Sequence, residues 1–204
     1  MFKSSSKTVF IGVTGMYDRP KNNVKKLIEG IYNAKIDIKM ITGDSVETAS
    51  SIAKECGFKN VKAITWNDMK ELSYEEFNRV VNEYNVFARM TPEFKLKIVD
   101  ALQESGHRVA IIGDGVNDVP ALKKAEVGIA MGKRGSDIAN EAGDIILLND
   151  DISSIIHGIK EGRTIFTNIR KVINYLLTAN LAEVVTVFFG SLWGVILFLP
   201  IQIL

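Results

Sequence analysis

The sequence predicts a parallel α/β domain followed by a membrane-spanning helix, and two features of its pattern support this prediction. Short apolar runs alternate with amphipathic stretches up to Lys171, and one long apolar run then extends from Val172 to Leu199. Continuous apolar strands that alternate with helices are typical of a parallel sheet with helices on both faces. An apolar run longer than about 20 residues can cross a bilayer.

The expected elements follow from these runs. Six apolar runs are expected to form strands: Val9–Val13, Ile36–Ile41, Val86–Ala88, Arg108–Ile112, Val127–Met131 and Asp144–Leu148. Amphipathic periodicity predicts helices over Asn23–Ala34, Ser45–Cys56, Glu93–Ser105 and Val119–Ala125. We therefore expect a soluble domain over residues 1–160, with residues 161–204 forming a stalk, the membrane helix and the start of a second one.

Composition excludes some classes of function. The formal net charge is +1 and basic residues form no stripe, so no nucleic-acid partner is expected. The lone Cys56 cannot form an internal disulfide, which indicates a reducing compartment. The first residues lack the long apolar core of a signal peptide, so secretion is not expected.

Ligands of parallel α/β sheets bind at the carboxyl ends of the strands, and three predicted strands end in polar residues. Thr42, Gly43 and Asp44 follow the first of these strands. Asp44 with Glu47 fits a capping box, so a well-capped helix is one interpretation. The other is that the Thr42 hydroxyl and the backbone N–H groups of this loop contact a phosphate at a helix N-terminus.

A second strand end leads through Arg89 into Thr91, Pro92 and Lys95. Thr91 and Pro92 suit the N-cap and the first position of a helix. Lys95 does not, because a cation in the first turn faces the positive end of the helix dipole. Either Lys95 is an exposed surface lysine or it neutralises a transferring phosphoryl group.

The third strand end is an acidic loop that contains Asp114, Asn117 and Asp118 between glycines and a helix. Carboxylates so close together repel one another unless a cation lies between them, and Mg²⁺ prefers such oxygen ligands. The alternative is a surface turn in which Asp118 caps the next helix. A hydroxyl, a lysine and a Mg²⁺-binding loop together are typical of phosphoryl transfer.

Several motifs resemble P-type ATPases, which are a branch of the haloacid-dehalogenase-like superfamily. They are MITGD, FARMTPEFKLKIV, GDGVNDVPALKKAEVGIAMG, the segment Gly15–Pro20 and the run GRTIFTNIRKVINYLLTANLAEV. The resemblance implies a Rossmann-like parallel sheet and the transport of a cation driven by ATP. It also implies roles for individual residues: Thr42, Gly43, Asp44 and Lys95 at the phosphoryl group, Asp114, Asn117 and Asp118 at Mg²⁺, and Asp18 and Arg89 near the nucleotide.

One departure from this family affects the expected activity. The phosphorylated aspartate of the family lies in a DKTGT motif, and that motif does not occur in the sequence. We therefore expect the chain to be inactive alone and to work with the remaining part of a pump. Two alternatives stay open: a regulatory module that binds an intact pump, or a soluble phosphatase in which Asp18 is the nucleophile.

The long apolar run carries one charged side chain, Glu183, which shares a helical face with Asn180. An ionisable residue inside a membrane indicates a transport site, and the Asn-x-x-Glu pattern resembles the cation-ligating stretch of calcium pumps. Basic residues before the run place its first end in the cytosol: Lys160, Arg163, Arg170 and Lys171. We expect an integral membrane protein whose soluble domain is cytosolic.

Overall fold

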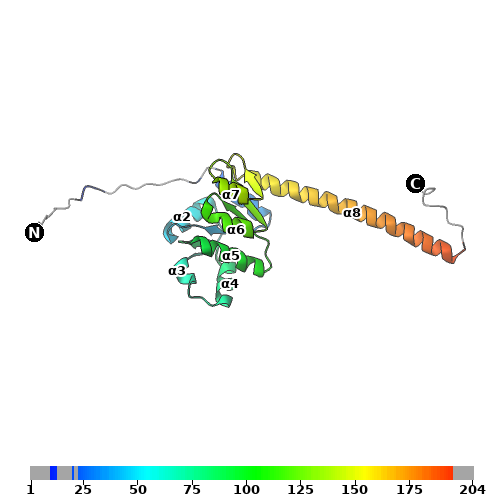
Figure 1. The fold of residues 1–204 in the computed structure, drawn as a ribbon, viewed down its shortest axis with the longest axis horizontal. Coiled ribbons are helices and arrows are strands. Elements are labelled where there is room, and N and C mark those ends of the chain that lie inside the picture. The colour runs from blue at the N-terminus through cyan, green and yellow to red at the C-terminus, as the bar shows by residue number, and fades with distance from the viewer. Residues whose placement is uncertain (1–9, 13–19, 21–22, 195–204) are drawn as a thin grey trace, which may run out of the picture. The chain divides into compact units, whose positions relative to one another are not determined.

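The computed structural model describes residues 10–12, 20 and 23–194 of the chain. It divides into two compact units, Met1–Leu148 and Asn149–Leu204. Figure 1 shows the first unit as strands surrounded by short helices, and the second as one long helix. The α/β class and the long apolar helix that the sequence predicts are both confirmed.

Two parallel sheets of three strands lie in the first unit. One has the order β1-β3-β2 and the other the order β4-β5-β6. Met40 pairs with Val86 in the first sheet, and Ala110 pairs with Val127 in the second. The strands are β1 (Met40–Ile41), β2 (Ala63–Thr65), β3 (Val86–Ala88), β4 (Ala110–Gly113), β5 (Val127–Met131) and β6 (Ile145–Leu147).

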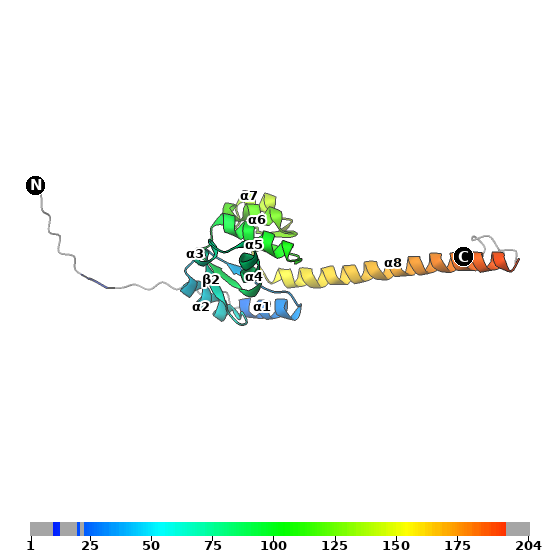
Figure 2. The same ribbon diagram turned by 90° about the horizontal axis from the view of Figure 1, so that it is seen from below.

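Helices cover the strands on two sides. Figure 2 shows α5, α6 and α7 on one side, and α1 and α2 on the other. The helices are α1 (Val24–Asn33), α2 (Val46–Cys56), α3 (Trp66–Met69), α4 (Tyr74–Glu83), α5 (Pro92–Glu104), α6 (Val119–Lys124), α7 (Asp137–Ala142) and α8 (Ser154–Leu192). A 3₁₀ turn, η1 (Val116–Asp118), precedes α6.

Strand β3 is the centre of the core, because its side chains alternate between the two helix layers. Phe87 packs with Phe94 and Ile98 of α5 in one apolar cluster. Val86 and Ala88 point the other way and pack with alanines of α2. All three residues of β3 are fully buried, which fixes the register of the strand that leads to Arg89.

Some predicted strands are shorter in the structure. Ile36–Ile41 is a strand only at Met40 and Ile41, and Ile36 is exposed. Phe10–Gly12 of the predicted strand Val9–Val13 have no regular secondary structure, and the two ends of that strand lie outside the described residues. Val86–Ala88 and Val127–Met131 are confirmed with their predicted bounds.

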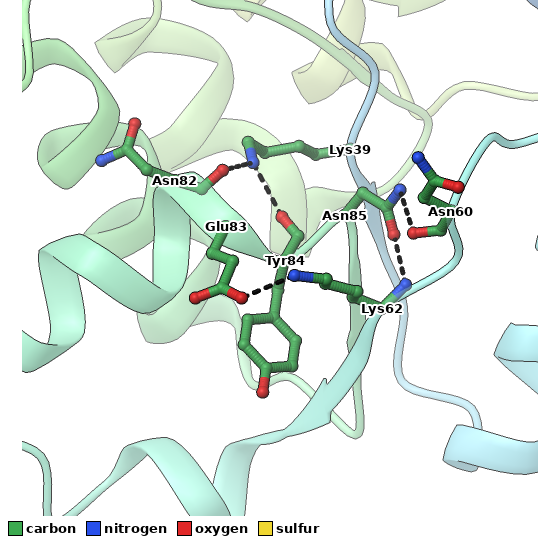
Figure 3. Close-up of polar contacts among 7 residues, drawn as sticks. All are labelled: Lys39, Asn60, Lys62, Asn82, Glu83, Tyr84 and Asn85. Atoms are coloured by element: carbon green, nitrogen blue, oxygen red, sulfur yellow. Dashed lines mark hydrogen bonds and ion pairs between the residues drawn. The ribbon is translucent and has the colours of Figure 1, made fainter.

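A polar network closes the end of the first sheet where β1, β2 and β3 begin. The ammonium group of Lys39 donates hydrogen bonds to the carbonyl oxygens of Tyr84 (2.7 Å) and Asn82 (3.2 Å), as Figure 3 shows. These carbonyls lie at the C-terminal end of α4, where a cation is favourable. Burial lowers the pKa of Lys39. The Asn85 carboxamide bridges neighbouring chain segments by accepting from the Lys62 N–H and donating to the Lys59 carbonyl oxygen.

The packing of helix α2 can be tested through Cys56, its last residue, because the Cys56 side chain is only 6% exposed. Burial raises the pKa of the Cys56 thiol, and the negative charge of Glu55 raises it further. Since the thiolate is the nucleophile, we expect iodoacetamide to alkylate the folded protein roughly tenfold or more slowly than it alkylates glutathione at the same pH. Mass spectrometry of the alkylated chain measures this rate. Alkylation of the chain unfolded in urea serves as the control and should be as fast as alkylation of glutathione. If the folded chain were alkylated as fast as glutathione, the burial of Cys56 would be contradicted.

Helix α8 is a single helix of 39 residues that has no buried residue and is apolar enough to cross a membrane. It begins at Ser154, well before the predicted apolar run, and continues without a break into that run as far as Leu192. Thr178 and Thr186 donate their hydroxyl hydrogens to carbonyl oxygens four residues earlier. These hydroxyl groups are therefore satisfied within the helix, as an apolar surrounding requires. The predicted start of a second membrane helix lies outside the described residues.

Candidate functional site

The loop after β1 is held against the residues that follow β3. The N–H of Met90 donates to the Thr42 carbonyl oxygen (3.0 Å), and the N–H of Arg89 donates to the Asp44 carbonyl oxygen (2.9 Å). Arg89 adopts a left-handed conformation with φ 55°, which costs about 1 kcal/mol for a residue with a side chain. These two hydrogen bonds offset that cost and fix the ends of β1 and β3 together.

The Thr42 hydroxyl lies within this loop. It donates to the Asp44 carboxylate and accepts from the Asp44 N–H, each at 3.1 Å. The capping box predicted for Asp44 and Glu47 is wrong by one residue, because Ser45 is the N-cap of α2 and accepts from the Thr48 N–H. The Asp44 carboxylate is therefore not used as a cap, and it is exposed beside the Thr42 hydroxyl.

Lys95 and Asp118 form an ion pair that joins α5 to the acidic loop. The Lys95 ammonium nitrogen lies 2.5 Å from one Asp118 carboxylate oxygen, and the two side chains are only 19% and 11% exposed. The Gly115 N–H contacts the other oxygen at 3.4 Å. This pair explains the cation in the first turn of α5, since a nearly buried carboxylate compensates for the unfavourable helix end.

The position of Asp118 excludes the interpretation in which this side chain caps the next helix. Asp118 precedes α6 but makes no side-chain capping hydrogen bond to it. Its side chain instead packs against Gly113, where an added Cβ would lie 2.5 Å from the Cβ of Asp118. A glycine is required at the end of β4 for this close approach. The loop is therefore shaped to turn Asp118 toward Lys95.

Asp114 and Asn117 are exposed on the same loop. The Asp114 carbonyl oxygen accepts from the Ser136 N–H (3.0 Å), which ties the loop to the N-terminus of α7. The sequence pattern does not indicate this contact, because it joins two loops that are about 20 residues apart. The Asp114 carboxylate is left facing solvent.

The acidic loop suits a cation that takes few protein ligands. Among residues 10–12, 20 and 23–194, no group of three or more His, Cys, Asp or Glu side chains is placed to hold a metal ion. Two carboxylates and one amide oxygen from a single loop match Mg²⁺, which keeps several waters and usually binds one or two carboxylates plus phosphate. Asp114, Asn117 and Asp118 could supply these oxygens.

The structure thus brings the predicted site residues together in two linked groups. The Thr42–Asp44 loop contacts Arg89 and Met90, and Lys95 contacts Asp118. The short segment from Arg89 to Lys95 takes part in both. Asp18 lies outside the described residues. An open pocket of about 270 Å³ lies elsewhere, lined by side chains of α4 and α5 such as Tyr74, Phe77 and Phe94.

Asn180 and Glu183 lie on α8, in the second unit. They are three residues apart and exposed, so their side chains share one face of the helix. Nothing else in the described part of α8 is acidic after Glu161.

Comparisons with known proteins show which family the chain is similar to. Residues 5–126 match the family described as haloacid dehalogenase-like hydrolase. A calcium-transporting ATPase of Bacillus subtilis is 45% identical over 207 residues, covering 100% of this chain and 23% of that protein. Calcium-transporting ATPase 1 of Saccharomyces cerevisiae is 43% identical over 177 residues, covering 85% of this chain and 19% of that protein. The chain therefore spans about a fifth of the length of these relatives.

Solved structures give the same result. A zinc-transporting PIB-type ATPase in the E2.Pi state has a TM-score of 0.67 and 28% identity, and the match covers 85% of this chain and 24% of that one. The catalytic domain of the CPx-ATPase CopB-B has a TM-score of 0.52 and 30% identity, covering 69% of this chain and 46% of that one.

Proposed function

The chain belongs to the haloacid dehalogenase-like hydrolase family and corresponds to part of a P-type cation ATPase, and we propose that it is part of a pump that couples ATP hydrolysis to the transport of Ca²⁺. The observation that carries this proposal is the Lys95–Asp118 ion pair, which lies at the end of β4 beside the exposed Asp114. An ammonium group and an acidic loop at strand ends are the components that phosphoryl transfer needs.

Each site residue has a role in this proposal. The Thr42 hydroxyl and the backbone of Gly43 and Asp44 contact the phosphoryl group. Lys95 neutralises its negative charge, because an ammonium group stabilises charge that develops on phosphoryl oxygens. Arg89 and Asp18 contact the nucleotide.

Asp114, Asn117 and Asp118 would hold Mg²⁺, which neutralises phosphoryl oxygens when it is bound. In this arrangement Asp118 has two partners, since Lys95 already contacts one of its oxygens. Lys95 thereby keeps the Asp118 carboxylate oriented while Asp114 remains open to solvent and to the ion.

The nucleophile comes from another polypeptide segment, because DKTGT does not occur in this sequence. We propose that the chain is inactive without the segment that carries this aspartate. The soluble unit then faces the cytosol, where ATP is present, and α8 crosses the membrane. Asn180 and Glu183 supply oxygen ligands to the transported ion; Ca²⁺ takes six to eight such ligands, so other helices must supply the rest.

Co-expression tests this proposal. The chain is produced together with the part of the Bacillus subtilis calcium-transporting ATPase that precedes the matching segment, and the membranes are incubated with radiolabelled ATP. We expect the two polypeptides to co-purify and an acid-stable phosphoenzyme to form on the partner when Ca²⁺ is present. The same assay with Zn²⁺ in place of Ca²⁺ tests the ion. Failure to co-purify together with the absence of phosphoenzyme would contradict a shared catalytic site.

Mg²⁺ binding can be measured on the chain alone. At ten times the dissociation constant, binding to the folded state stabilises it by about 1.4 kcal/mol, so Mg²⁺ should raise the melting temperature. Asp114→Asn should remove most of this increase, because it deletes the solvent-facing carboxylate. Asp137→Asn is the matched control, since Asp137 is an exposed acid in the first turn of α7. An equal loss in both variants would indicate screening by Mg²⁺ instead of a site.

A further inference from the structure

The first half of α8 carries four basic residues before the apolar run begins: Lys160, Arg163, Arg170 and Lys171. A helix turns by about 100° per residue, so these four side chains fall within an arc of about 100°. They extend along about 16 Å of the helix. Glu161 is the acid of this stretch and lies outside the arc. We call these four residues the basic face of α8.

The opposite side of the same stretch is apolar. Ile165 and Ile169 lie there, and Val172, Ile173 and Leu176 at the start of the apolar run fall within the same arc of about 100°. Each of these five side chains is about half exposed. The stretch is therefore amphipathic, with an apolar face that continues directly into the apolar run that begins at Val172. An amphipathic helix of this kind that carries Lys and Arg on its polar face is typical of the interface between a membrane and water.

The orientation of the helix in the membrane does not require the four basic residues to lie on one face. Basic residues set the orientation of a membrane helix by their number near its end, whichever side of the helix they occupy. A single basic face instead presents a line of cations to one surface. In the described part of the chain, no ion pair to an acid is found for Lys160, Arg170 or Lys171.

We propose that the basic face of α8 binds the head groups of anionic phospholipids in the leaflet from which the helix emerges. The phosphate and carboxylate groups of such lipids complement the charge of the face. Lys and Arg side chains extend along the helix and place their charged ends at the head groups while their stems cover apolar surface. Each basic residue close to an anionic surface strengthens binding by roughly fivefold.

Lipid binding by the full chain tests this proposal. The chain is purified in neutral detergent micelles and titrated with phosphatidylserine or with phosphatidylcholine, and the bound lipids are counted by native mass spectrometry. We expect phosphatidylserine to bind more tightly and potassium chloride to weaken this binding. Replacing Lys160, Arg170 and Lys171 together by Gln should reduce the affinity for phosphatidylserine on the order of 100-fold.

The control variant changes the same number of charges elsewhere. Lys26, Lys54 and Lys123 are exposed lysines of the first unit, and their joint replacement by Gln lowers the net charge equally. This variant should retain the preference for phosphatidylserine. Equal loss in both variants, equal binding of the two lipids by the wild type, or full displacement of the lipid by excess inorganic phosphate would each overturn the proposal. The readout does not depend on phosphoenzyme formation, so it remains informative whether or not the pump function holds.

Discussion

Lys95→Met is expected to lower the free energy of unfolding of the α/β unit by about 3 kcal/mol, because removing one partner leaves a nearly buried carboxylate without its cation. Among the residues that the structure describes, the Gly115 N–H at 3.4 Å is the hydrogen-bond partner that Asp118 keeps once the ammonium group is gone. Urea unfolding followed by circular dichroism measures the change. The phosphoenzyme of the co-expressed pump should be lost in the same variant, because Lys95 also neutralises the phosphoryl group in our proposal.

A double-mutant cycle separates the ion pair from other effects of the substitution. Asp118→Asn removes the buried charge, so Lys95→Met should cost much less in that background than in the wild type. Additive losses from the two substitutions would show that the 2.5 Å contact is not a significant source of stability. A large coupling energy would show that α5 and the acidic loop are held together by this pair.

Phe87→Ala is expected to destabilise the α/β unit by about 3–5 kcal/mol, because it removes a large side chain from the centre of the core. Phe87 is fully buried between β3 and the helices α4 and α5. Loss of this side chain should also disturb Arg89, two residues further along the chain, and so weaken the contact between the ends of β1 and β3. Urea unfolding measures the loss of stability.

Phe10→Ala is the matched control for this prediction, since the same side chain is deleted at a position that is 80% exposed. Its effect should lie within about 0.5 kcal/mol of zero. Similar losses in the two variants would mean that β3 does not have the central position described above.

The sequence predicted those parts of the fold that depend on local pattern. Val86–Ala88 and Val127–Met131 are continuous apolar runs bounded by polar residues, and both are strands with the expected bounds. Ala63–Thr65 was missed, because only Ala63 and Ile64 are apolar between Lys62 and Thr65, which is too short an apolar run to indicate a strand. Helix α4 was missed although its capping box is visible in the sequence as Ser73 and Glu76.

The contacts of the site depend on tertiary structure and could not be predicted from local pattern. The residue types at each strand end were recognisable, but the Lys95–Asp118 pair joins residues 23 positions apart. Its formation depends on how α5 packs beside the end of β4. The helix dipole indicated that Lys95 has a special role, since a cation in the first turn of a surface helix is unfavourable. It did not indicate Asp118 as the partner. The hydrogen bond from the Ser136 N–H to the Asp114 carbonyl oxygen is not indicated by the local sequence around either residue.

Paramagnetic broadening by Mn²⁺, used in place of Mg²⁺, tests the central claim that these strand ends form one site. In an NMR spectrum of the chain, the amide signals of Gly43, Lys95 and Gly115 should broaden at the same low concentration of Mn²⁺. The signals of Lys62 and Asn85, at the opposite end of the first sheet, should remain sharp. Broadening of Gly115 while Gly43 and Lys95 stay sharp would contradict a common phosphoryl-transfer site.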